Sequence, residues 1–110
     1  MNRIFCSTGA IIGRPNGRDL SLLHGAVKKL HCDGFELMMY DTWYDKPNWM
    51  DDCMRDAAAY TPIFHVEKDV GTLISKNGAR DTERAIELFE INCTLAKKYG
   101  ASLLVLHLWG

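Results

Sequence analysis

Apolar residues along this chain occur either in short runs or in longer segments with helical spacing. The short runs predict four β-strands, at residues 3–8, 35–39, 62–66 and 102–107. Between them, apolar positions recur with the period of an amphipathic helix and charged residues fill the other side. The pattern therefore predicts three helices between four strands, in the order βαβαβαβ.

The expected helix boundaries rest on capping and helix-breaking residues. Asp19 is expected to cap the first helix and Asn48 the second, which Pro62 ends because the residue before a proline avoids the α region. Asp81 is expected to cap the longest helix, which closes at Gly100.

The spacing of the strands indicates the fold class. Intervals of roughly thirty to forty residues suit βα crossover units, which imply a parallel sheet. If the sheet grows in chain order, right-handed crossovers place all three helices on one face. A complete (β/α)₈ barrel needs about 250 residues. We therefore expect an α/β chain whose residues 1–110 form a single N-terminal half of a TIM barrel, either a fragment or a naturally short protein.

Composition limits the classes of partner. With 110 residues, 47% hydrophobic and 25% charged, the chain has the content of one globular domain. A formal net charge of -1 provides no bulk attraction to nucleic acid or to an anionic membrane, so neither is an expected partner. The four cysteines form no C-x-x-C pair and are expected to be reduced thiols. With no signal peptide or membrane-crossing run, we expect a cytoplasmic protein.

Two histidines occupy equivalent places in the pattern. His65 and His107 each follow an apolar run, at the C-terminal end of a predicted strand, where parallel α/β proteins place their sites. Either alone could be a histidine bonded to the backbone. Because the position repeats on successive strands, we expect both imidazoles at the same C-terminal face of adjacent parallel strands and favour a functional interpretation. His24 and His31 are interpreted as surface residues.

Other candidates lie near the same edge. Glu36 alternates with Phe35 and Leu37, so it faces the opposite side, where it would need a cation or a salt bridge. Trp43 belongs to an aromatic group in the second βα loop that could stack on a sugar or base, or pack over the rim; the others are Tyr40, Tyr44 and Trp49.

Two further loops have several interpretations. Residues 9–18 are rich in glycine and carry Arg14 and Arg18, which would suit a phosphate, although the pattern is no P-loop and a flexible loop is preferred. Residues 67–80 are long enough for a lid or substrate loop, although ordinary solvated charge is the preferred interpretation.

Three segments resemble those of a known superfamily. These are Asp33-Gly34-Phe35-Glu36-Leu37, Phe64-His65 and Val105-Leu106-His107. In this order they are similar to strand ends of the xylose-isomerase-like TIM barrels, which include sugar-phosphate isomerases and epimerases and the endonuclease IV type of abasic-site nuclease.

The resemblance implies a divalent-metal enzyme, using Zn, Mn or Mg held mainly by residues on later strands. His65 and His107 match positions that are metal ligands in the nuclease branch and substrate contacts in many isomerases. Glu36, Trp43, His65 and His107 are therefore the candidate substrate-binding residues, with both histidines also possible metal ligands. The catalytic carboxylates would lie on later strands, so we expect neither catalysis nor strong metal binding from this chain alone.

Three functional hypotheses follow. The favoured one is half of a metal-dependent isomerase or epimerase acting on a sugar or sugar phosphate. The second is a phosphodiesterase acting at abasic DNA. The third is a non-catalytic half-barrel that self-associates, because open strand edges favour a homodimer or larger assembly.

Overall fold

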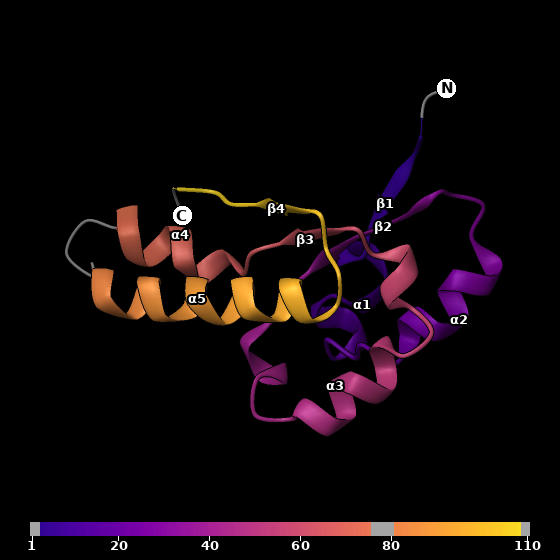
Figure 1. The fold of residues 1–110 in the computed structure, drawn as a ribbon, viewed down its shortest axis with the longest axis horizontal. Coiled ribbons are helices and arrows are strands. Elements are labelled where there is room, and N and C mark those ends of the chain that lie inside the picture. Colours follow the sequence, from indigo (N-terminus) through magenta and orange to yellow (C-terminus); the bar gives the residue numbers. More distant parts are fainter. Residues whose placement is uncertain (1–2, 76–80, 109–110) are drawn as a thin grey trace.

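The computed structural model describes residues 3–75 and 81–108 and contains one four-stranded parallel sheet (Figure 1). The strands lie side by side in chain order, and each is shorter than predicted: β1 Phe5–Ser7, β2 Gly34–Met38, β3 Ile63–His65 and β4 Leu103–Val105. Cys6 lies opposite Phe35, and Leu37 lies opposite Phe64, which is in turn opposite Leu104. The predicted α/β fold with a parallel βαβαβαβ sheet is confirmed.

Helices α2, α3 and α5 lie on the same side of this sheet, below the strands in Figure 1. Because the strands also follow chain order, the three crossovers share one hand. The helices of the described residues are α1 Gly9–Ile12, α2 Leu22–Lys29, α3 Pro47–Met54, α4 Lys68–Ser75 and α5 Thr82–Lys98, with short 3₁₀ turns η1 Arg14–Asn16, η2 Asp41–Trp43 and η3 Ala58–Tyr60. Within the described ranges, no helix is both long and apolar enough to cross a membrane.

The main core lies between the sheet and these helices. Phe35, Leu37 and Phe64 project from the helix-covered face of the sheet and are fully or almost fully buried. Burying a side chain of this size stabilises the fold by about 1.5–3 kcal/mol. They pack against residues such as Leu23 and Met50 from the helices, so α2 and α3 are held to the sheet by apolar contact.

Among the described residues, no helix covers the opposite face of the sheet (Figure 1). Alternation directs Glu36, Met38 and Ile63 to this face, where they are half-buried. Glu36 thus faces away from Phe35 and Leu37, as predicted. Leu103 of β4 is 55% exposed, because β4 is an edge strand and this side of it is uncovered.

The first βα connection is more ordered than the flexible loop predicted. It contains α1 and η1, and the buried Thr8 ties their start to the sheet because its Oγ1 accepts a hydrogen bond from the Met38 backbone at 2.9 Å. Gly13 is needed between the two elements, since a Cβ there would approach the Gly9 carbonyl oxygen within 2.5 Å. Gly17 ends η1 with φ 67°, a left-handed conformation that favours glycine.

The third βα connection contains a helix in its described part, where the sequence predicted a loop. Residues 68–75 form α4, whereas 76–80 lie outside the described residues. Val70 from α4 packs with Val66, Ala85 and Leu88 in a second apolar cluster. Burial of Val70 explains why the segment folds against α5 instead of extending into solvent.

The expected caps are correct at one of three helices. Asp81 caps α5, accepting a hydrogen bond from the Arg84 backbone at 3.0 Å. Asp19 instead accepts bonds from the backbone and hydroxyl of Ser21, in a turn before α2 begins at Leu22. Asn48 lies inside α3, which begins one residue earlier at Pro47 because proline suits the first position of a helix.

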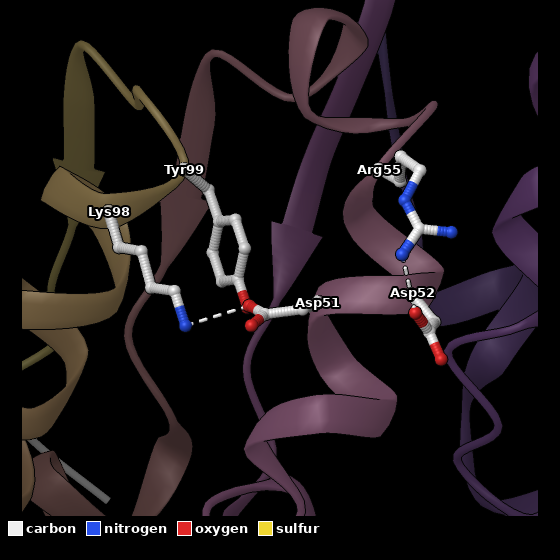
Figure 2. A network of polar contacts seen from close by, with 5 residues as sticks. All are labelled: Asp51, Asp52, Arg55, Lys98 and Tyr99. Atoms are coloured by element: carbon white, nitrogen blue, oxygen red, sulfur yellow. Dashed lines mark hydrogen bonds and ion pairs between the residues drawn. The ribbon is translucent and has the colours of Figure 1, made fainter.

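Helices α3 and α5 are joined through Asp51 (Figure 2). One oxygen of its carboxylate accepts a hydrogen bond from the Tyr99 hydroxyl at 2.6 Å and lies 2.7 Å from Nζ of Lys98. These two partners lower the pKa of Asp51, whereas burial and the adjacent carboxylate raise the pKa of Tyr99. Asp52 pairs instead with Arg55 of its own helical segment, at 2.7 Å.

We predict that Asp51→Asn lowers the thermal midpoint more than Asp52→Asn, because only Asp51 links two elements. Since the folded-state pKa of Asp51 is lowered, its contribution is present above its unfolded pKa and is lost as the pH falls through the folded value. Melting curves below about pH 5 should therefore show a shallower acid dependence in Asp51→Asn than in the parent. Equal midpoints for the two variants would contradict this role.

Candidate functional site

His65 and His107 meet at the C-terminal edge of the sheet. His65 is the last residue of β3, and His107 lies two residues after the end of β4. Because Val105 is opposite His65 in the register, alternation brings His107 to the same face. The two Nε2 atoms are 3.4 Å apart and the ring centroids 4.7 Å apart. The prediction that adjacent parallel strands direct both imidazoles to one face is confirmed.

The hydrogen bonding of His65 identifies Nε2 as its unprotonated nitrogen. Its Nδ1 lies 2.8 Å from the Val66 carbonyl oxygen, which can only accept, so Nδ1 carries the proton of a neutral ring. The lone pair of Nε2 then points toward the His107 ring. In tetrahedral zinc sites with Zn–N bonds of about 2.0–2.1 Å, two ligand nitrogens lie about 3.3 Å apart. The spacing of the histidine pair fits such a site.

The histidine pair gains no third ligand from the described residues. In the ranges 3–75 and 81–108, one group of at least three histidine, cysteine or acidic side chains lies close enough to share a cation. It consists of Asp41, Glu67 and Asp69 and includes neither histidine. Glu36 lies on the same sheet face as His65, but its register partner is Ile63, two residues before His65. Two imidazole nitrogens fall short of the three protein ligands typical of catalytic zinc.

The three carboxylates form a second cluster at the same edge. Asp41 begins η2, Glu67 precedes α4 and Asp69 lies in its first turn, and one oxygen from each lies within 4.8 Å of the others. Asp41 and Asp69 are exposed, whereas Glu67 is only 4% exposed. The sequence analysis did not single out Glu67, although it directly follows the β3 apolar run and could have been noticed for that reason.

A buried polar network holds Glu67 in place. Asn92 of α5 donates from Nδ2 to the Tyr44 hydroxyl oxygen at 2.7 Å and to the Leu88 carbonyl at 2.8 Å. The Tyr44 hydroxyl donates in turn to Oε1 of Glu67 at 2.8 Å, and the Glu67 backbone N–H donates to Asn92 Oδ1 at 3.3 Å. The network therefore connects α5, the segment after η2 and the end of β3.

Burial dominates the electrostatics of Glu67. It raises the pKa of this carboxyl, and Asp41 and Asp69 raise it further, whereas the Tyr44 hydroxyl bond opposes the shift. Burial and the Glu67 carboxylate likewise raise the pKa of Tyr44. The surroundings therefore disfavour the ionised form of Glu67. A cation or a hydrogen-bond donor beside the carboxylate would stabilise that form.

A pocket of about 480 Å³ opens beside this cluster, at the C-terminal end of β2. Its walls include the three carboxylates together with Arg14, Arg18 and Lys68. Met38 also lines it and is the register partner of His65, so the pocket and the histidine pair share one edge of the sheet.

The structure corrects the role expected of Trp43. Its indole is 1% exposed within the main core, and Nε1–H donates to the Arg18 carbonyl at 2.8 Å. Tyr40 covers it edge-on, with ring centroids 5.2 Å apart. Trp43 therefore supports the pocket wall from behind and offers no ring face to a ligand, so we remove it from the candidate substrate contacts.

No protein-family model, curated protein or solved structure matches this chain. The functional argument therefore depends on the geometry of the sheet edge.

We predict that Tyr44→Phe lowers the free energy of unfolding by about 1–3 kcal/mol, because it leaves Glu67 and Asn92 each short of one hydrogen-bond partner. Tyr60→Phe is the matched control, since Tyr60 is largely exposed, and should change stability little. Urea denaturation of both variants measures the difference. If both variants lose the same free energy, the network does not hold Glu67.

Proposed function

We propose that this chain forms the first four βα units of a metal-dependent sugar or sugar-phosphate isomerase or epimerase with a xylose-isomerase-like barrel. The observation that carries this proposal is the His65–His107 pair, whose Nε2 atoms lie 3.4 Å apart at the C-terminal edge of a parallel sheet. Support also comes from the sheet itself, because strands in chain order with helices on one face match half of a barrel.

In this proposal a divalent metal, when bound, would supply Lewis-acid polarisation of the sugar oxygens. His65 and His107 hold the metal or orient the substrate, and the Val66 carbonyl keeps His65 in the tautomer that presents the Nε2 lone pair. Proton transfer next to the carbonyl group is assigned to carboxylates beyond these four strands. The 110-residue chain is accordingly expected to be inactive by itself.

The abasic-site phosphodiesterase is the alternative in which both histidines are metal ligands. The spacing of the two Nε2 atoms would serve it equally well. Asp41, Glu67 and Asp69 lie at the same edge, however, and a DNA phosphodiester offers these carboxylates no hydrogen-bond donor. Carboxylates are suitable acceptors for sugar hydroxyl groups, so the cluster favours the sugar enzyme.

We predict that the chain binds Zn²⁺ or Mn²⁺ with a dissociation constant above about 1 µM, because the described residues around the histidine pair provide two ligands. His65→Ala and His107→Ala should abolish the weak zinc binding seen by calorimetry and by the histidine ring signals in NMR spectra. His31→Ala is the control, since His31 is exposed on the surface, and should retain it.

Two outcomes would count against this view of the site. Submicromolar affinity at a 1:1 ratio would show that the pair has further ligands. Zinc binding that persists in both His65→Ala and His107→Ala would remove the observation on which the proposed function depends.

The open face of the sheet favours self-association of the isolated half-barrel as a further proposal. Leu103 is exposed and Ile63 and Val105 are half-buried on this face, and β1 and β4 each have one neighbour in the sheet. In a two-fold dimer, β1 of one copy would pair with β4 of the other, which would give eight strands around a shared interior.

We predict that the chain is a dimer or larger at high micromolar concentration and that Leu103→Glu shifts it toward monomer, because a charge would enter the shared interior. Ile86→Glu is the control: Ile86 is 53% exposed on α5, nearly the same as Leu103, but lies on a helix. Light scattering coupled to size-exclusion chromatography reports the assembly. A compact, monodisperse species of single-chain mass would contradict the prediction.

A further inference from the structure

We propose that the pocket at the end of β2 binds a phosphorylated sugar, with Arg14 and Arg18 contacting the phosphate and the carboxylates on the opposite wall accepting hydrogen bonds from the sugar hydroxyls. This inference rests on the proposed function for its substrate class, and it selects the phosphorylated sugars among those considered there. It also assigns the binding of the phosphate to residues that the histidine pair does not involve.

The first observation is the cavity itself. Its volume of about 480 Å³ lies within the range of about 300–1,000 Å³ that is usual for small-molecule sites. The walls contain three cationic and three anionic side chains, so a ligand with an anionic end and a neutral end rich in hydroxyl groups matches both kinds of partner. A purely anionic ligand would leave the carboxylates unused, and a neutral sugar would leave the guanidinium groups unused.

The second observation is the way in which Arg18 is positioned. Its φ of 53° is a left-handed conformation that is uncommon outside glycine, and Arg18 is the non-glycine residue that adopts it among those described. Its carbonyl accepts the Nε1–H bond of the buried Trp43, so the core holds the strained backbone in place.

The side chain of Arg18 is directed by the same contacts. Its guanidinium carbon lies 5.1 Å from the centroid of the Tyr40 ring, a cation–π arrangement that fixes the side chain over a pocket-lining residue. Arg14 enters the pocket from η1, whose geometry is set by Gly13 and Gly17. A guanidinium group can donate two parallel hydrogen bonds to phosphate oxygens, so two of them suit this group better than single point charges.

The opposite wall supplies the acceptors. Asp41 and Asp69 are exposed and line the pocket, and Glu67 is kept in place by its hydrogen bond from Tyr44. Because the surroundings disfavour ionised Glu67, hydroxyl donors from a sugar would stabilise it. Lys68 lies between two of these acids in the sequence and adds a third cation to the pocket lining.

The test is calorimetric titration of the full 110-residue chain, without metal, with fructose 6-phosphate, inorganic phosphate and fructose. We expect fructose 6-phosphate to bind at least about tenfold more tightly than either of the other two, because it alone uses both walls. Arg18→Gln and Arg14→Gln should each weaken that binding by about tenfold. Arg55→Gln is the control, since Arg55 is exposed and pairs with Asp52 on another surface.

Several results would overturn the inference. These are unchanged affinity in both pocket variants, equal binding of inorganic phosphate and sugar phosphate, or no binding at all. Arg14→Gln covers the case in which Arg18→Gln alters the fold, because Arg14 is exposed and its side chain is not part of the core. Since the titration contains no metal, its failure is separate from failure of the histidine pair to bind zinc.

Discussion

The shared hand of the three crossovers is the constraint on which the rest of this structure depends. A parallel strand can be added only by way of a connection that crosses the sheet, and the three connections here cross the same face. One face is therefore buried by Phe35, Leu37 and Phe64 against the helices, while the other keeps Glu36, His65 and His107. The same constraint collects every βα connection at one edge, where the histidine pair and the pocket lie.

The polar groups at this edge are stabilised by contacts between distant parts of the sequence. Glu67 is bonded to Tyr44, 23 residues earlier, and its backbone to Asn92, 25 residues later. Without such partners, a buried carboxylate would cost several kcal/mol, which is about as much as the whole stability margin of a domain. The position of Glu67 therefore depends on the packed fold, because its backbone partner, Asn92, comes from α5.

The sequence predicted those features that depend on local pattern. Apolar runs indicated the four strands, and the repeated position of His65 and His107 after such runs predicted that both lie at one edge. Features that depend on tertiary packing were missed. Trp43 looked available because it follows a strand in a polar segment, but η2 turns its ring into the core. Residues 68–75 looked like a solvated loop because their apolar positions are few, and Val70 becomes buried only when α5 is beside it. Asn92 gave no signal, since one amide among helix residues is ordinary.

The division of the apolar residues into two clusters has a consequence for local unfolding. Val66, Val70, Ala85 and Leu88 form a small cluster around α4 and the first half of α5, separate from the main core beneath the sheet, and Tyr44 and Leu104 contact both. Clusters of this size commonly open as cooperative units below the free energy of global unfolding. Amide hydrogens of α4 should then exchange faster than those of β2. A molecule held between Arg18, which is bonded to Trp43 of the main core, and Asp69 of α4 would join the two units. It would slow the exchange of α4, because opening would require its release.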